Sequence, residues 1–188
     1  DALRISEARL AQAQTLAKIG SWYRAGISGA LEYSEEMFHL LGVNKDTYRL
    51  TTDAYVELMH PDDRDTIHQY SFAAADKPDD YQYVHRIIRP DGAIRYMEHR
   101  SSAIIDDHGI VIARSGTTQD ITEQKRMQSA LQSSEARFRS IFENTTVGVS
   151  ITDKNFNYVS TNKAYQKMLG YSARELLDMR WVDITHPD

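Results

Sequence analysis

The stretch of the sequence with the most obvious chemical potential is His60-Pro61-Asp62-Asp63-Arg64, where an imidazole, two carboxylates and a guanidinium lie close together. Such a group could bind a metal ion or transfer protons. A structural role also accounts for it: Pro61 would end one helix, and Asp62 or Asp63 would cap the next. Arg64, in the first turn of that helix, would pair with a neighbouring acid. We favour the structural role. An enzyme built on His60, Asp62 and Asp63 is the alternative, and it requires these side chains to converge on a cleft.

Histidines elsewhere offer a second kind of chemistry, because an imidazole can bind a haem iron held between a helix and a sheet. His68, in a helical stretch, and His85, in a predicted central strand, are the two positions for such a ligand. A single histidine in a helix is more often a polar-face or core residue, so haem is disfavoured. The sequence contains no cysteine, which excludes cysteinyl-flavin photochemistry and disulfides. No cofactor is identified, and an unknown small non-covalent ligand remains an open alternative.

Two predicted strands of mixed polarity carry the remaining pocket candidates. Alternate residues of a strand point to the same face, but both alternation sets mix apolar and polar residues, so the sequence does not decide which set faces inward. One set is Tyr81, Tyr83, His85 and Ile87 with Ile94, Tyr96, Glu98 and Arg100; the other is Gln82, Val84, Arg86 and Ile88 with Arg95, Met97 and His99. The candidates for a ligand pocket are His68, Tyr83, His85, Tyr96 and Glu98. Tyrosines at such positions belong more often to a core.

The composition is that of a soluble globular chain, with 188 residues, 41% hydrophobic and 26% charged. The formal net charge of −5 does not favour nucleic acid or an anionic membrane surface as a partner. No apolar run approaches the roughly 20 residues of a membrane span, and the first ten residues are too charged for a secretory signal. The absence of cysteine fits a reducing compartment, so a cytoplasmic location is the working expectation.

An internal repeat organises the chain. "SEARL" at 6–10 returns as "SEARF" at 134–138, an offset of 128 that also relates Gly20 to Gly148. After a two-residue contraction, "YVELMHPD" at 55–62 pairs with "WVDITHPD" at 181–188. A period this long indicates tandem domains rather than a solenoid. We therefore expect one whole unit and the front of a second, in a piece of a longer protein.

A helix with a narrow apolar seam opens each copy of the repeat. Apolar or small residues follow 3,4 spacing in both copies, and the other positions are mostly polar, so a partner helix is implied. The positions are Leu3, Ser6, Leu10, Ala13 and Ala17 in the first copy and Met127, Leu131, Ser134, Phe138 and Ile141 in the second. Asp120 and Glu123 predict a capping box that starts the second helix. We favour a parallel coiled coil between two copies of the chain, with Leu3, Leu10, Phe138 and Ile141 in the dimer seam. A solvated connector helix is the alternative.

Between these helices the first unit predicts two strands, a helical middle and three further strands. The helical stretch 35–41 has Ser34 as its N-cap and Gly42 as its stop, a second helix ends at Pro61, and a third extends to about residue 76. Turns at 90–92 and 106–109 separate the last three strands. The predicted fold class is α+β, a five-stranded antiparallel sheet with helices on one face. The predicted domains are a helix at 1–18, the sheet domain at 19–120, a linker helix at 121–143 and a partial second domain at 144–188.

These stretches, taken in order, resemble the PAS sensory fold with its C-terminal PAC motif. The similar segments are "IGSWYRA" at 19–25, "YSEEMFHLLG" at 33–42, "MHPDDR" at 59–64, "HRIIRPDGAIRYMEHR" at 85–100 and "GTTQDITEQKRMQSAL" at 116–131, with "SEARFRSIFENTTVGVSITD" at 134–153 and "YQKMLGYSARELL" at 165–177 resembling the front of another PAS unit. The resemblance implies that "DIT" at 120–122 ends the last strand and starts a signalling helix. It also implies a downstream output domain on the same chain, such as a histidine kinase of a two-component system or a diguanylate cyclase.

The expected function is therefore sensory and non-catalytic. A ligand or partner would shift the packing under the sheet, and Asp120 and Thr122 would pass that change to the helix and its seam residues Met127 and Leu131. The chain would form a homodimer through its flanking helices. A second class of function stays open, in which the module binds no ligand and only holds dimers or recruits partners.

Overall fold

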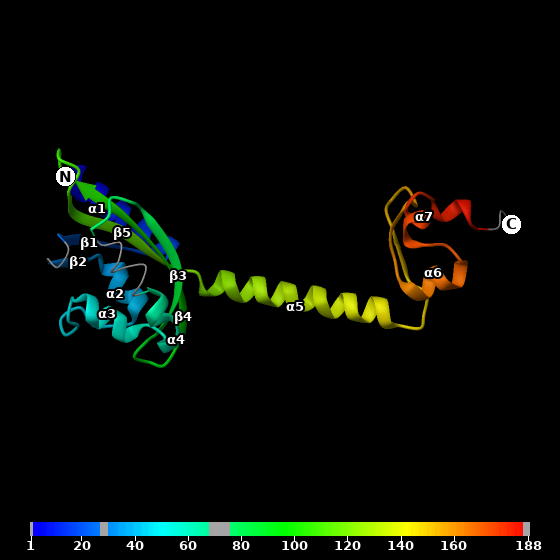
Figure 1. Cartoon of the computed structure of the whole chain (residues 1–188), viewed down its shortest axis with the longest axis horizontal. Helices are drawn as coiled ribbons and strands as arrows, with labels where there is room; N and C mark the ends of the chain where they lie inside the picture. Colours follow the sequence, from blue (N-terminus) through cyan, green and yellow to red (C-terminus); the bar gives the residue numbers. More distant parts are fainter. Residues whose placement is uncertain (1, 27–29, 68–75, 186–188) are drawn as a thin grey trace. The chain divides into compact units, whose positions relative to one another are not determined.

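The computed structural model describes residues 2–26, 30–67 and 76–185, and it divides into two units, Asp1–Arg126 and Met127–Asp188 (Figure 1). The boundary falls within helix α5 (Thr122–Asn144). None of the helices in the described ranges is long and apolar enough to cross a membrane. The predicted continuation of a helix to about residue 76, and the second His-Pro-Asp at 186–188, fall mainly outside the described residues.

Unit 1 is built on a twisted antiparallel sheet of five strands within its described residues (Figure 1). The strand order is β2-β1-β5-β4-β3, and every neighbouring pair is antiparallel. The strands are β1 (Ile19–Ala25), β2 (Leu31–Tyr33), β3 (Tyr81–Ile88), β4 (Ile94–Ile105) and β5 (Val111–Asp120). The first two strands and the last three are thus joined through β1 and β5, which confirms the predicted α+β class.

Three short helices cover one face of this sheet, namely α2 (Glu35–Leu41), α3 (Thr52–Leu58) and α4 (Pro61–Ile67) (Figure 1). They enclose an apolar core between helices and sheet. Its fully buried members are Met37, Leu40, Leu41, Tyr55, Met59, Ile87 and Met97. The helical middle therefore folds because it covers apolar strand residues, since none of these helices is long enough to be stable alone.

The first helix, α1 (Ala2–Ala17), packs much less closely than the others. Apart from half-buried Gln14, the side chains described along it are exposed, including those of Ile5 and Leu16. Contact with the domain is made near its C-terminal end, where Thr15 Oγ1 donates to Glu36 Oε2 at 2.9 Å and Gln14 Nε2 donates to Ser21 Oγ at 3.2 Å. Ile5 and Leu16 are therefore not covered within the described part of the chain.

Helix α2 begins and ends where the sequence predicts. The Ser34 hydroxyl accepts from Met37 N, and it also accepts from Ser21 N on β1 at 3.0 Å. Gly42 ends the helix in the left-handed region at φ 69°. The helix lies so close to β1 that a Cβ on Gly20 would sit 2.7 Å from Met37 Cα, so only glycine fits there.

Unit 2 repeats this arrangement after α5, at the predicted offset of 128. Its elements are β6 (Ser150–Thr152), β7 (Tyr158–Thr161), α6 (Lys163–Leu169), α7 (Ala173–Leu177) and the 3₁₀ turn η2 (Trp181–Asp183). Asn162 caps α6 where Ser34 caps α2, and Gly170 ends α6 at φ 77°. Gly148 faces Tyr165 as Gly20 faces Met37, with 3.2 Å between the added Cβ and Tyr165 Cα. The sequence repeat is a structural repeat.

The corner at residues 59–64 corrects the predicted roles of its residues. Helix α3 has already ended at Leu58, and Pro61 is the first residue of α4 rather than the end of the helix before it. Neither aspartate caps α4. Instead, the backbone amide of Asp62, in the first turn of the helix, donates to His60 Nδ1 at 3.3 Å. Arg64 has no acidic partner among the described residues, and its guanidinium donates to the backbone oxygens of Met59 and Glu57.

The second aspartate of the corner holds α4 to the sheet. Asp63 Oδ2 accepts from Arg86 N at 2.7 Å and from Arg86 Nε at 3.0 Å, and these bonds lower the pKa of Asp63. Asp62 is exposed and reaches Arg86 Nη2 only at 3.3 Å. Asp62 and Asp63 thus share Arg86 as a partner, and Asp62 Oδ2 also lies 3.5 Å from His60 Nδ1, so these side chains connect the corner to β3. Within the described ranges no group of three or more histidine or acidic side chains could hold a metal ion.

Replacing Asp63 by alanine should destabilise unit 1, because the Arg86 guanidinium and amide both lose their acceptor. We expect the free energy of unfolding to fall by about 2 kcal/mol, the range of hydrogen bonds to charged groups. The matched variant Asp62→Ala should cost less than about 0.5 kcal/mol, as an exposed ion pair does. Urea unfolding followed by the fluorescence of Trp22, in a Trp181→Phe background, reports on unit 1. Equal losses in the two variants would contradict the assignment.

Candidate functional site

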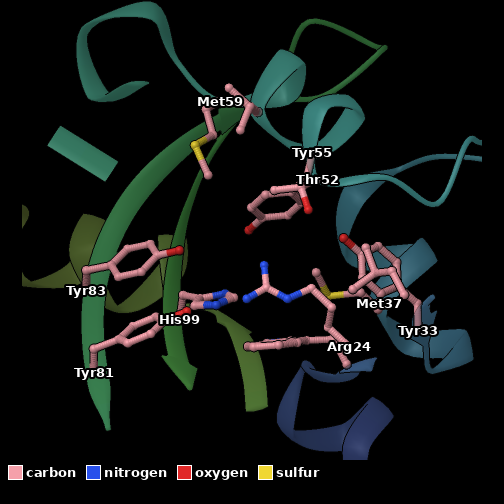
Figure 2. A pocket seen from close by; sticks show the side chains of 12 residues that line it. Arg24, Tyr33, Met37, Thr52, Tyr55, Met59, Tyr81, Tyr83 and His99 are labelled. Atoms are coloured by element: carbon pink, nitrogen blue, oxygen red, sulfur yellow. The ribbon is translucent and has the colours of Figure 1, made fainter. Parts of the chain in front are cut away.

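A cavity of about 50 Å³ lies in unit 1 between the sheet and the helices. Strands β1 to β4 and helices α2 and α3 supply its walls (Figure 2). Half of the lining residues carry rings, namely Trp22, Tyr33, Tyr55, Tyr81, Tyr83 and His99. Aliphatic and thioether side chains, the hydroxyl of Thr52 and the guanidinium of Arg24 complete the lining; the first group is Leu31, Met37, Val56 and Met59.

Strand alternation decides which side chains reach this cavity. On β1, Trp22 and Arg24 are buried on the inner face, whereas Tyr23 between them is 37% exposed. On the hairpin of β3 and β4, Tyr83 lies directly opposite His99, so the two share a face. His99 is stacked between two rings, with centroid distances of 5.0 Å to Trp22 and 4.9 Å to Tyr83.

The polar centre of the cavity is Arg24. Figure 2 shows its guanidinium pointing into the space between Tyr55, Tyr83 and His99. The residue is only 8% exposed, and its Nε and Nη2 are buried without a hydrogen-bond partner. Among the described residues it forms no ion pair, whereas buried charges in proteins are normally paired.

A second arginine lies directly opposite Arg24 on the neighbouring strand β5, and its surroundings differ. Arg114 is fully buried, donates from Nε to Ser101 Oγ at 2.9 Å, and donates from its two terminal nitrogens to the backbone oxygens of Lys77 and Asp79. Its guanidinium also lies over the Tyr81 ring, 4.5 Å from the centroid. Two cations thus share one face of the sheet, which makes the electrostatic potential in the cavity positive.

Two buried histidines are held neutral beside these cations. His85 Nε2 lies 2.8 Å from Tyr55 Oη, and burial lowers the pKa of His85 to about 4. His99 Nδ1 lies 3.1 Å from Thr118 Oγ1. Burial, aided by the positive charge of nearby residues including Arg114 and Arg24, lowers the pKa of His99 to about 3. Near neutral pH neither histidine adds a charge to the cavity.

The pocket residues selected from the sequence separate into three groups. Tyr83 lines the cavity, and His85 is buried next to it with its ring engaged by Tyr55. Tyr96 and Glu98 pair with Arg86 and Val84, so they lie on the opposite face of the sheet from Tyr83 and His99 and do not line this cavity. His68 lies outside the described residues.

Sequence reasoning missed Trp22, Arg24 and His99. The hairpin register contained the signal for His99: Ile88 pairs with Ile94, so odd-numbered residues of β3 face odd-numbered residues of β4, whereas the predicted set had joined odd with even. Arg24 follows Trp22 by two and shares its face, but a charged residue is rarely assigned to an interior. The register places His99 on the face of Tyr83, and alternation along β1 places Arg24 on the face of Trp22.

The size of the cavity argues against a large cofactor. Ligand pockets usually measure about 300–1,000 Å³, several times the 50 Å³ found here. A haem iron bound to His85 Nε2 would also have to displace Tyr55 Oη, which lies 2.8 Å from that nitrogen. The residues present do not fit a haem in this conformation.

The predicted signal-transmission residues lie where the sheet meets α5. Thr122 N donates to Asp120 Oδ1, and Thr122 Oγ1 accepts from Tyr96 N, both at 2.9 Å. The predicted capping box is incomplete, because Glu123 contacts Lys18 instead, at 3.9 Å. Helix α5 starts at Thr122 and ends at Asn144, one residue later at each end than predicted.

The seam residues of α5 are all exposed in the single chain. Their exposed fractions are 64% for Met127, 60% for Leu131, 57% for Phe138 and 65% for Ile141. Leu3 and Leu10 lie within α1, but their side chains are outside the described part of the structure. The apolar stripe of α5 therefore has no cover within the described chain.

The buried histidines predict an acid sensitivity of unit 1. Unfolded histidine takes up a proton near its ordinary pKa of 6.5, whereas His85 resists protonation to about pH 4. The free energy of unfolding therefore has its full value above pH 6.5 and falls as the pH is lowered from 6.5 to about 4. The loss is up to about 1.4 kcal/mol per pH unit for each such histidine. In His85→Gln, whose amide can still meet Tyr55 Oη, the loss between about pH 6 and pH 5 should be smaller by about 1 kcal/mol.

Urea midpoints measured across this range by Trp22 fluorescence test the point. His108→Gln is the control, because this histidine lies exposed in the hairpin turn before β5. An acid sensitivity that is unchanged in His85→Gln would refute the assignment.

Curated relatives of the chain include sensor proteins. It is 24% identical over 170 residues to the sensor protein FixL of Bradyrhizobium diazoefficiens, covering 90% of this chain and 33% of that protein. It is 27% identical over 137 residues to the uncharacterized protein y4lL of Sinorhizobium fredii, covering 71% of this chain and 16% of that one. A segment of 71 residues is 31% identical to the sensor histidine kinase TmoS of Ectopseudomonas mendocina. The chain thus spans a third or less of each of these proteins.

Solved structures show the same fold. A sensory box histidine kinase/response regulator from Burkholderia thailandensis matches with a TM-score of 0.56 and 25% identity, over 70% of this chain and 98% of that one. The N-terminal domain of a diguanylate cyclase with PAS/PAC sensor from Marinobacter aquaeolei matches with a TM-score of 0.52 and 20% identity, over 57% and 98%. The second likeness concerns the fold alone.

Two family models match the chain, one described as PAS fold over residues 30–118 and one described as PAS domain over residues 136–188. The first begins just before β2 and covers the helices α2 to α4, the strands β3 and β4 and most of β5, and it leaves out β1. The second covers the end of α5 and the elements of unit 2 that follow it, so the two matches correspond to the two copies of the repeat. The chain belongs to the PAS domain family.

Proposed function

We propose that this chain is the sensory and regulatory part of a cytoplasmic signal-transduction protein. Unit 1 perceives a signal or small ligand and passes it through a dimeric α5 to a downstream output domain, either a histidine kinase or a diguanylate cyclase. The relatives named as sensor histidine kinase and as diguanylate cyclase with PAS/PAC sensor support these two outputs. The fragment itself carries no catalytic role in this proposal, and neither nucleic acid nor membrane is a partner of it.

The observation that carries the proposal is the junction of β4, β5 and α5. Ile121 N donates to Tyr96 O, and Tyr96 N donates to the Thr122 hydroxyl, each at 2.9 Å. Both Ile121 and Thr122 are buried. The first turn of α5 is therefore fastened to β4, the strand that carries His99 into the cavity. A change in the twist of β4 moves the start of the helix.

The same junction also holds the end of α1. Asp120 N donates to Lys18 O at 3.1 Å, and Gln119 Nε2 donates to Ala17 O at 3.3 Å. Lys18 itself leaves the helix in the left-handed region at φ 53°. The helix that enters unit 1 and the helix that leaves it thus meet at one end of β1 and β5, and a shift of these strands acts on both.

The partner proposed for the apolar stripe of α5 is α5 of a second copy. Its 3,4 spacing is the seam of a two-stranded coiled coil, and such seams are buried in pairs. A stripe this narrow, on a helix that is otherwise polar, suits a self-complementary helix better than a domain surface. The downstream domain of each chain would then be brought beside its counterpart.

The small cavity favours a second candidate function. A PAS module that binds no ligand needs only a well-packed interior. A cavity of about 50 Å³ is small enough to belong to such an interior. In this case the chain would only dimerise or recruit partners. Retention of a small molecule by the purified chain, seen by native mass spectrometry, separates the two candidates.

Single cysteines along α5 test the dimer, and the natural chain contains none to interfere. Met127→Cys, Leu131→Cys and Phe138→Cys should form disulfide-linked dimers on mild oxidation, because seam residues of parallel helices face each other. Ser129→Cys and Ala136→Cys are matched controls on the opposite side of the helix. We expect seam positions to cross-link several-fold more. Low and equal efficiencies at all five positions would rule out the parallel dimer.

The junction is tested by Thr122→Val, which keeps the shape of the side chain and removes the acceptor for Tyr96 N. The buried amide is then left without a partner, at a cost of about 1–3 kcal/mol. Hydrogen exchange of the Tyr96 amide should accelerate about tenfold or more. Thr117→Val, at a half-buried threonine on β5, is the control. Unchanged protection of the Tyr96 amide in Thr122→Val would mean that the helix start is not held through this bond.

A further inference from the structure

The interior of unit 1 contains a site for an anion. We propose that the cavity binds a small carboxylate of single negative charge, with an apolar tail of two or three carbons and with Arg24 as the partner of its carboxylate group. The inference rests on the sensory function proposed above and names the chemical class of its ligand.

The first step of the argument is the state of Arg24. The side chain is more than nine-tenths buried, and Figure 2 shows its guanidinium aimed into the cavity. Nε and Nη2 lack acceptors, and among the described residues no carboxylate pairs with it. The segments 27–29 and 68–75, which the structure does not describe, contain no acidic residue in their sequence. The chain around the cavity therefore provides no counter-charge, and an isolated buried charge is strongly disfavoured.

The second step is the charge that the site requires. His85 and His99 are neutral near pH 7, because burial lowers both pKa values. Arg114 already directs its guanidinium to Ser101 Oγ and to two backbone oxygens. The uncompensated charge in the cavity is the single positive charge of Arg24, so a ligand with one negative charge neutralises the cavity. A doubly charged phosphate or dicarboxylate would leave an excess negative charge there.

The third step is shape. A guanidinium presents parallel N–H donors that match the two oxygens of a carboxylate. Trp22 Nε1, a buried donor of the same lining, is also without an acceptor. Beyond these donors the walls are rings and the side chains of Met37 and Met59, which favour an apolar tail.

Size sets the limit of that tail. One ordered water needs about 10–15 Å³ of such space, so the 50 Å³ of this cavity accepts a group of only a few heavy atoms. Propionate and butyrate have this size and chemistry. Nitrate offers the same planar oxyanion without the tail, so it distinguishes recognition of charge alone from recognition of the whole molecule.

The experiment is a titration of the purified chain with sodium propionate, butyrate, nitrate and chloride at constant ionic strength, and with neutral 1-propanol. Binding is followed by calorimetry and by the thermal midpoint of Trp22 fluorescence in the Trp181→Phe background. We expect saturable binding of propionate or butyrate with a rise in the midpoint, at least about tenfold weaker binding of nitrate, and none of 1-propanol. Absence of saturable carboxylate binding overturns the proposal, as does equal binding of nitrate or chloride.

Variants assign the binding to Arg24. Arg24→Met should abolish it while leaving the midpoint in carboxylate-free buffer unchanged or higher, because a buried unpaired charge is removed. Arg24→Lys keeps the charge without the planar fork and should bind at least about tenfold more weakly. Arg100→Met, an exposed arginine of β4 that pairs with Glu98, is the control and should bind normally. Equal binding by Arg24→Met and the natural chain refutes the assignment.

Cross-linking at Leu131→Cys in the same samples separates this inference from the proposed function. Seam cross-linking without carboxylate binding overturns the ligand and leaves the dimeric sensor. Carboxylate binding with no preference for seam positions supports the anion site and overturns transmission through a paired α5.

Discussion

The antiparallel pairing of β1 with β5 is the constraint on which the rest of unit 1 depends. Seven residue pairs, from Ile19 opposite Gln119 to Ala25 opposite Ala113, bring the end of α1 and the start of α5 to one end of the sheet. The same register puts Arg24 beside Arg114 on the inner face. This register also places Trp22 opposite Gly116, where an added Cβ would lie 2.8 Å from the indole ring. Cavity and helix junction are thus two consequences of one strand pairing.

Features that depend on residues close together in the sequence could be predicted, whereas features that depend on contacts between distant segments could not. Ser34 and Gly42 were identified because a cap is decided within one turn of a helix, and the repeat was visible because whole units recur. The corner at Pro61 was misread because the partner of Asp63 lies on β3, and the partners of Arg64 are backbone oxygens exposed by the end of α3. The faces of β3 and β4 were misassigned for the same reason, since their register depends on a loop whose length alternation alone does not reveal.

The repeat also explains how the second unit holds the far end of α5. At the position of Ser34, unit 2 has Asn162, whose Oδ1 accepts from Val149 N and Tyr165 N as the serine hydroxyl accepts from Ser21 N and Met37 N. The longer amide additionally donates to Phe142 O and Val147 O, at 2.8 and 2.9 Å. Helix α5 is therefore fixed by buried polar contacts at its first turn, through Thr122, and at its last, through Phe142. The side chains of the apolar stripe, between these two turns, are exposed.

A helix held in this way transmits a change only if the sheet has two states of similar free energy, and Arg24 provides the physical means. An unpaired buried cation makes the unoccupied interior unfavourable, and the neutral histidines beside it cannot relieve the positive potential. An anion would remove that cost, so it would stabilise the arrangement of β1 and β4 that brings Arg24, Trp22 and His99 around it. Because Tyr96 N of β4 donates to the Thr122 hydroxyl in the first turn of α5, the proposed anion would act on the helix through β4, without any contact between ligand and helix.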